Sequence, residues 1–234
     1  MRYPVLIVLH QEHSTPGRIG HAVQQLGYTL DVRRPRFGEA LPATMAEHSA
    51  AIIFGDDFIR REIEWVGVPL RDHQPFLGIC LGAQICAKFL GGKVFRHTSG
   101  HAEAGYYPVR PTPAGLAVVE TWPECVYQWH REGFDLPYGG ELLAEGDIFE
   151  VQAIRFQSAF ALQFHPEVTH AMMHKWTTHG HERLAMPGAK PRHTHFADRA
   201  VYDYSARTWL KVFLERWLGR AQQGAGQFLP AAVD

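Results

Sequence analysis

The chain has 234 residues, of which 46% are hydrophobic and 20% are charged, and its formal net charge is −1. This composition is typical of a globular chain with enough material for a sizeable core. A nearly neutral chain has no global field that would gather nucleic acid, and no apolar run is long enough to span a bilayer. We therefore expect neither nucleic acid nor a membrane as a partner.

The three cysteines include no Cys-x-x-Cys pair, which argues against a disulfide framework. The N-terminal apolar run is too short for a signal sequence, and no small-residue cleavage site follows it. These features predict a cytoplasmic protein.

Strand-like and helix-like segments alternate through the first part of the chain. Tyr3–His10 is a continuous apolar run, typical of a strand buried on both faces of a parallel sheet. The helix that follows has Ser14 or Thr15 as its predicted N-cap and Gly27 as its stop signal. The remaining segments are predicted strands at 28–34, 49–55 and 74–79 and helices at 14–27, 56–66 and 81–92. This alternation predicts an α/β fold with a doubly wound, mostly parallel sheet flanked by helices.

The middle of the chain reads differently. Short β-prone runs separated by turn signals occupy residues 105–111, 116–122, 124–130, 149–156 and 160–165. Two helices are predicted after them, at 168–181 and 203–219. We expect one domain over residues 1–219, with a short additional β region in its middle, and a loosely ordered tail over 220–234.

A cysteine lies between two glycines in the sequence GICLG, at the junction between the predicted strand 74–79 and the predicted helix 81–92. Such a Gly-x-nucleophile-x-Gly pattern makes a sharp elbow in which larger side chains would collide with neighbouring backbone. The start of the helix directs unpaired N–H groups at the sulfur of Cys80, and the N–H of Leu81 could donate to an oxyanion. Cys80 is therefore the candidate nucleophile, whereas Cys86 is predicted to pack in the core.

A thiolate nucleophile needs a base, and the base needs a group that orients it. His165 ends a predicted strand, where side chains enter the crevice of α/β folds. Glu167 lies two residues further on, close enough to hold the imidazole in one tautomer. Together with Cys80 these residues form a Cys…His-x-Glu set, which is far more specific than either part alone.

The segment PFLGICLGAQICAKFLGGKV, followed later in the chain by QFHPE, resembles the class I glutamine amidotransferases. The chain is similar in particular to stand-alone proteins related to the glutaminase domain of GMP synthase, and the resemblance extends to WHREGFDLP, ELLAEGD and VQAIRF. It implies a flavodoxin-like fold and hydrolysis of the glutamine side-chain amide through a thioester, without a cofactor. It also implies roles for the residues that match: Cys80 as nucleophile, His165 as general base and acid, Glu167 as orienter, Leu81 as oxyanion donor, and Gln84 and His130 in the glutamine pocket.

One departure from the family pattern concerns Gly55. The third strand of these proteins normally runs into a Gly-Gly-Pro-Met-type loop, which gives a second oxyanion N–H and part of the substrate pocket. Here Gly55 stands alone before residue 56. A true deletion would remove a donor worth ~10²–10³ in rate and could pull Gly55 away from the thiolate. The abrupt junction instead favours a segment that is missing from the sequence as printed.

The sequence contains 15 histidines. His170 and His174 have the i, i+4 spacing of metal ligands, but no His-Glu-x-x-His pattern or cysteine pair accompanies them, so we predict no metal site. Four aromatic residues at helical spacing are predicted to be core or subunit-contact residues: Trp176, Trp209, Phe213 and Trp217. The last helix could therefore supply a homodimer face.

Three functions remain open at this stage. The first is a glutaminase-type enzyme whose ammonia goes to a separate synthetase. The second is a hydrolase of another γ-glutamyl compound, which would use the same thioester chemistry. The third is a catalytically weakened homologue that acts as a binding or regulatory subunit, which the missing loop would favour.

Overall fold

A mixed sheet forms the centre of the computed structural model, which describes residues 2–55 and 60–222. Its strands are β1 (Val5–Val8), β2 (Leu30–Arg33), β3 (Ala50–Phe54), β4 (Phe76–Ile79), β7 (Arg110–Pro111), β10 (Glu141–Glu145), β11 (Val151–Phe156) and β12 (Ala159–Leu162). Their order is β2-β1-β3-β4-β12-β11-β10-β7. The first five of these strands run parallel and the last three pair antiparallel. The predicted α/β fold with a mostly parallel sheet is confirmed.

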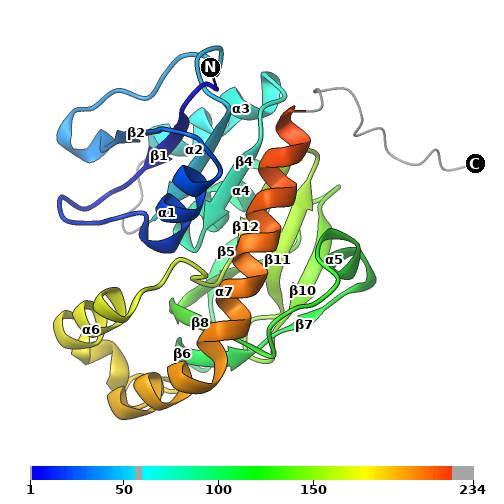
Figure 1. Cartoon of the computed structure of the whole chain (residues 1–234). Helices are drawn as coiled ribbons and strands as arrows, with labels where there is room; N and C mark the ends of the chain where they lie inside the picture. The colour runs from blue at the N-terminus through cyan, green and yellow to red at the C-terminus, as the bar shows by residue number, and fades with distance from the viewer. Residues whose placement is uncertain (1, 56–59, 223–234) are drawn as a thin grey trace, which may run out of the picture.

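Helices cover both faces of the sheet (Figure 1). On one face lie α1 (Gly17–Gln25) and the long α7 (Arg192–Gln222), and on the other lie α2 (Arg60–Trp65), α3 (Gly67–Arg71) and α4 (Leu81–Phe89). The smaller elements are η1 (Pro35–Phe37), α5 (Pro113–Val118), α6 (His170–His179) and η2 (His181–Ala185). Two small antiparallel sheets of two strands each pair β5 (Val94–Arg96) with β9 (Glu132–Phe134) and β6 (Glu103–Pro108) with β8 (Cys125–His130). These two small sheets are the short β region expected in the middle of the chain.

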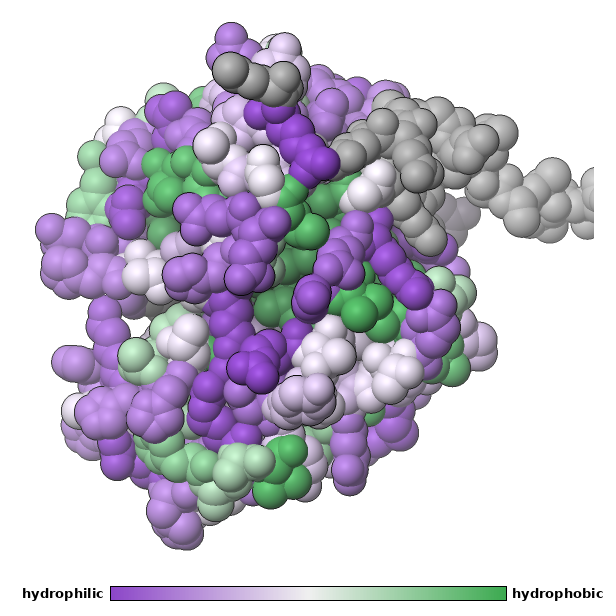
Figure 2. All heavy atoms as spheres, in the orientation of Figure 1, coloured by the Kyte–Doolittle hydropathy of each residue, from purple (hydrophilic) through white to green (hydrophobic). Residues whose placement is uncertain are grey.

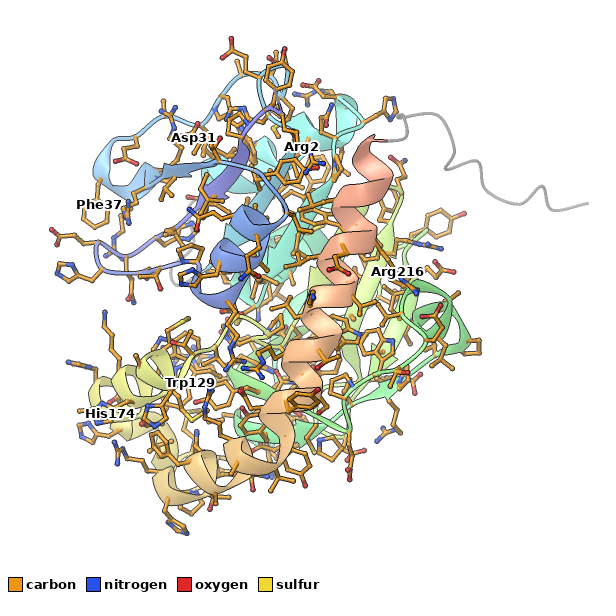
Figure 3. The ribbon with its side chains drawn as sticks, viewed as in Figure 1. Arg2, Asp31, Phe37, Trp129, His174 and Arg216 are labelled. Atoms are coloured by element: carbon orange, nitrogen blue, oxygen red, sulfur yellow. The ribbon has the colours of Figure 1, made fainter. Side chains whose placement is uncertain are left out.

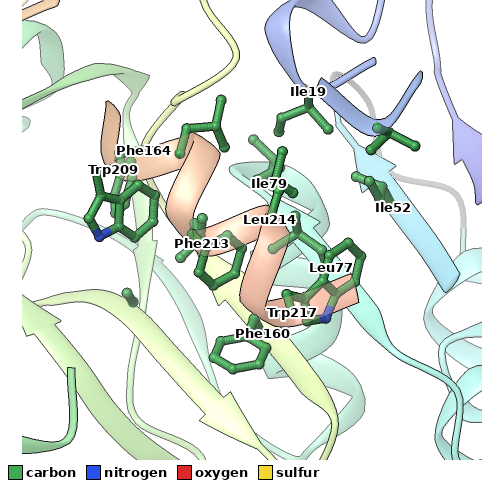
Figure 4. Packing of buried hydrophobic residues seen from close by; sticks show 14 of the residues in the cluster. Ile19, Ile52, Leu77, Ile79, Phe160, Phe164, Trp209, Phe213, Leu214 and Trp217 are labelled. Atoms are coloured by element: carbon green, nitrogen blue, oxygen red, sulfur yellow. The ribbon is translucent and has the colours of Figure 1, made fainter. Parts of the chain in front are cut away.

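The largest core cluster lies between α7 and the sheet (Figure 4). Trp209, Phe213 and Trp217 are stacked along α7 and are at most 5% exposed. Phe213 also packs edge-on against Phe160 of β12, with ring centroids 5.2 Å apart. These three residues are therefore covered within the chain, and this face of α7 is not available to a second subunit.

Two local predictions are wrong. Residues 116–122 are not a strand, because Thr112 caps a helix instead: its hydroxyl accepts from the N–H of Gly115, and Pro113 opens α5. The expected caps Ser14 and Thr15 are not used, because Pro16 occupies the N-cap position of α1. At this end of α1 the N–H of Arg18 donates to the carbonyl of Glu167, which is far away in the sequence but only 3.1 Å from it in the fold.

Helix α7 is longer than expected, because it begins at Arg192 and continues to Gln222. Most of the predicted tail, residues 223–234, lies outside the described residues, as do residues 56–59 at the start of the predicted helix 56–66. Within the described ranges, no helix combines the length and apolarity that crossing a membrane would require.

Candidate active site

Cys80 lies at the turn between β4 and α4 and has an unusual backbone. Its φ is 51° and its ψ is −106°, a conformation that only glycine adopts without strain. Two backbone hydrogen bonds hold it there: its N–H donates to Leu162 of β12 at 2.8 Å, and its carbonyl accepts from Gln84 at 3.0 Å. The side chain is 8% exposed. Strain at a turn beside a helix start is the geometry of a nucleophile elbow.

Three glycines allow the elbow to form. A Cβ on Gly82 would lie 2.1 Å from the carbonyl oxygen of Ile53, and one on Gly78 would lie 2.4 Å from that of Gly82. A Cβ on Gly55 would lie 1.9 Å from the Cβ of Leu81. Gly55 therefore stays directly beside the elbow despite the short β3–α2 connection, of which residues 56–59 lie outside the described part of the chain.

His165 and Glu167 form a buried pair just beyond β12. The Nδ1 of His165 and the Oε1 of Glu167 are 2.8 Å apart, and the residues are 7% and 2% exposed. The N–H of His165 donates to the carbonyl of Tyr127 on β8 at 2.8 Å, which fixes the backbone at this point. The two-residue spacing thus brings the carboxylate to the imidazole, as the sequence predicts.

The other ring nitrogen of His165 is free to act. Its Nε2 is buried and makes no hydrogen bond within the described residues. Burial alone would lower the pKa of this imidazole, but the charge and hydrogen bond of Glu167 and the neighbouring sulfur of Cys80 outweigh burial and raise the pKa of His165 to about 10. Trp176 of α6 covers the ring edge-on at a centroid distance of 4.8 Å. The surroundings therefore favour an imidazolium beside the sulfur.

This shift predicts a pH dependence of stability. The pKa of His165 rises on folding from about 6.5 to about 10, so its contribution is complete below about pH 6.5 and is lost as the pH rises through 10. We expect the free energy of unfolding, measured with urea, to fall between pH 7 and pH 10. His165→Gln should flatten this decline, and equal slopes in the two proteins would contradict the assignment.

Gln84 and His130 lie further from the sulfur and are joined to it by Gln163, which the sequence analysis missed. The amide nitrogen of Gln163 lies 3.7 Å from the Sγ of Cys80, and its oxygen accepts from Gln84 at 3.2 Å. His130 shares the carbonyl of Glu132 with Gln84. The sequence could have indicated Gln163, because residues two apart in an extended segment lie on the same side of the chain, and Gln163 is two residues before His165.

A second pair that the sequence analysis did not identify lies at the end of β1. His10 hydrogen bonds through Nδ1 to the carbonyl of Phe54, the last residue of β3, at 2.5 Å. Its Nε2 pairs with the carboxylate of Glu62 on α2, and both residues are at most 2% exposed. His10 thus links β3 to α2 on both sides of the short connection.

The histidines of α6 are exposed to solvent. His174 lies on the outer side of α6, whereas Trp129 of β8 packs against Trp176 of this helix, with ring centroids 6.1 Å apart (Figure 3). The surface around α6 is predominantly hydrophilic (Figure 2). Within residues 2–55 and 60–222, no group of three or more histidine, cysteine or acidic side chains could hold a metal ion.

A family model described as glutamine amidotransferase class-I matches residues 17–180, which include the elbow and the His165–Glu167 pair. The chain belongs to the class I glutamine amidotransferase family. Its curated relatives include the glutamine amidotransferase-like protein YfeJ of Salmonella typhimurium, which is 26% identical over 86% of this chain and 90% of its own length. Another relative, one of the subunits of the glutamine-hydrolysing GMP synthase of Methanocaldococcus jannaschii, is 31% identical over 59% of this chain and 71% of its own length.

A solved structure supports the same assignment. A glutamine amidotransferase of Thermotoga maritima superposes with a TM-score of 0.83 and 26% sequence identity. The superposition covers 93% of this chain and 99% of the Thermotoga chain. The resemblance drawn from the motifs around Cys80 and His165 is therefore confirmed at the level of family and fold.

Proposed function

We propose that this protein hydrolyses the side-chain amide of glutamine through a thioester on Cys80. The observation that carries the proposal is the 2.8 Å hydrogen bond between His165 Nδ1 and Glu167 Oε1, in a ring whose Nε2 is unpartnered beside Cys80 within the described residues. A carboxylate on Nδ1 fixes the tautomer and leaves Nε2 to exchange a proton with the sulfur. This is the arrangement that thioester chemistry requires.

The reaction follows from these positions. Transfer of the Cys80 proton to His165 gives the imidazolium that the surroundings favour, and the thiolate attacks the amide carbon of the substrate. The C–N bond then breaks as His165 returns the proton to the leaving nitrogen, which departs as ammonia and leaves a thioester. His165 next takes a proton from water, whose oxygen attacks the thioester. Glutamate is released and the thiol of Cys80 is restored.

The oxyanion needs donors near the elbow. Leu81 is the first residue of α4, so its N–H has no acceptor within the helix. Gly55 is in contact distance of Leu81 and is the candidate for the second donor, which would act from the end of β3. The side-chain nitrogen of Gln84 is occupied by Glu132 and Gln163, and we propose that its oxygen accepts from the substrate.

The ammonia acceptor would be a separate protein. One relative is named as a subunit of a glutamine-hydrolysing GMP synthase, which supports a synthetase as the partner. The short β3–α2 connection favours a second candidate function, a binding or regulatory subunit with little turnover. Another γ-glutamyl amide would use the same chemistry and would differ only in its leaving group.

Labelling with diazo-oxo-norleucine, a glutamine analogue with an electrophilic carbon, tests the proposal. We expect intact-mass analysis and peptide mapping to find a single adduct on Cys80, and glutamate to be released when glutamine is supplied. Turnover of other γ-glutamyl amides but not of glutamine would favour the hydrolase alternative. Absence of any adduct, with Cys80 no more reactive than Cys125, would favour the binding subunit.

A further inference from the structure

Four polar side chains are buried together behind the candidate site, on β6, β8 and β11. They are Glu103, Gln128, His130 and Gln152, and none is more than 6% exposed. Acyl transfer as described above uses none of them directly. A carboxylate and an imidazole buried together are costly unless they are paired and hydrogen bonded, so their arrangement calls for a reason.

Both ring nitrogens of His130 face acceptors. Nδ1 lies 2.9 Å from the carbonyl oxygen of Glu132, while Nε2 lies 3.1 Å from the Oε1 of Gln128 and 3.0 Å from the Oε2 of Glu103. The amide of Gln128 cannot turn to offer a donor, because its nitrogen already donates to Gln152 at 2.6 Å. A neutral imidazole has one proton and would leave one nitrogen facing an oxygen lone pair. An imidazolium beside an ionised Glu103 gives each of these contacts both a donor and an acceptor.

The carboxylate of Glu103 supplies the balancing charge. It lies within 3.0 Å of the ring and also accepts from the amide nitrogen of Gln152 at 3.1 Å. The side chain of Glu132 is not part of this cluster, because it pairs with the exposed Arg96 at 3.0 Å. It is the backbone carbonyl of Glu132 that the imidazolium holds.

A series of hydrogen bonds connects the backbone carbonyl of Glu132 to the sulfur of Cys80. The carbonyl also accepts from the side-chain nitrogen of Gln84 at 2.8 Å, and the same nitrogen donates to the oxygen of Gln163 at 3.2 Å. With its oxygen held in this way, Gln163 must direct its NH₂ group at Cys80, 3.7 Å away. Gln84 and Gln163 are at most 3% exposed, so water does not compete for these bonds.

We propose that His130 and Glu103 form a charged positioning pair, in which the imidazolium fixes the Glu132 carbonyl and thereby sets, through Gln84 and Gln163, the position of the Cys80 sulfur. The protonation state of His130 stands independently of the reaction, whereas the kinetic consequence rests on the proposed function. His130 is a positioning residue here, because it acts through other groups and does not touch the reacting atoms.

The protonation state is measured directly in the wild-type protein. Nitrogen NMR of the His130 ring, assigned with His130→Gln, should show both ring nitrogens protonated at neutral pH. A ring with one proton would overturn the proposal. This measurement needs no substrate, and the variant serves only to assign the signals of the ring.

The kinetic test uses Glu103→Gln, which keeps the shape and one acceptor oxygen but removes the charge. We expect His130 to lose one ring proton and Cys80 to react about 10–100-fold more slowly with diazo-oxo-norleucine and with iodoacetamide, since a misplaced nucleophile loses that much rate. Arg96→Gln is the matched control: it breaks the other contact of Glu132 and should react like the wild type.

The outcomes separate the two proposals. If Glu103→Gln reacts like Arg96→Gln, the positioning pair is refuted. If diazo-oxo-norleucine fails to label the wild type, while iodoacetamide still distinguishes Glu103→Gln from Arg96→Gln and the ring carries two protons, the pair is upheld and the proposed glutaminase function fails.

Discussion

Cys80→Ala is expected to abolish glutamine hydrolysis and labelling by diazo-oxo-norleucine, with a loss of turnover on the order of 10³-fold or more. Without the sulfur no thioester can form, and His165 and Glu167 have nothing to activate. The fold should persist, because Cys80 lies in a turn held by backbone hydrogen bonds to Leu162 and Gln84. Circular dichroism and urea unfolding would verify that the fold is intact.

Cys86→Ala is the matched control within the same helix. Cys86 is 1% exposed in α4, and burial raises the pKa of its thiol to about 12, which leaves it unreactive at neutral pH. Its replacement should leave turnover within about twofold and cost only the stability of a small cavity. If Cys86→Ala were as damaging to turnover as Cys80→Ala, the nucleophile would be wrongly assigned.

Gly82→Ala is expected to have the largest effect on stability. The added Cβ would lie 2.1 Å from the carbonyl oxygen of Ile53 and 2.9 Å from its carbon, both in the backbone of β3. A strand in the middle of the sheet cannot move aside, so α4 must shift and carry the elbow with it. We expect a loss of about 3 kcal/mol or more in the free energy of unfolding, measured with urea, and loss of Cys80 labelling.

Gly219→Ala provides the comparison. Gly219 lies in α7, and among the described residues an added Cβ would meet no atom of another element within 4 Å. Here the substitution should raise stability by about 0.5–1 kcal/mol, because alanine loses less conformational freedom in a helix. Equal effects of the two substitutions would show that the contact between Gly82 and β3 is absent in solution.

Sequence patterns predicted those parts of the fold that local chemistry decides. The apolar run at Tyr3–His10 became β1, the Gly-x-Cys-x-Gly elbow has the strained backbone expected of it, and Glu167 reaches His165 through a two-residue spacing. Each of these depends on neighbours in the chain, which a periodicity or a motif can report.

Long-range partners were not predictable. The resemblance implies a place for His130 in the glutamine pocket, which stays a prediction. No motif indicates that its ring nitrogens contact Glu103, Gln128 and the carbonyl of Glu132. Glu103 comes from β6, the strand that pairs with β8, and Gln152 joins it from β11. A single sequence shows that such residues are polar at strand positions, but not which of them pair across the sheet. The pairing of His10 with Glu62 was not predictable for the same reason, because the two residues are far apart in the sequence.

The insertion of β12 between β4 and β11 has a consequence for how the protein is made. Cys80 leaves the ribosome well before His165, and β12, which precedes the imidazole, pairs with β4 across a long sequence separation. Contacts of such long sequence separation form slowly and late in folding. A nascent or truncated chain that ends before β12 would therefore carry Cys80 without the imidazole beside it. The pairing of Cys80 with His165 would then arise only after β12 has joined the sheet.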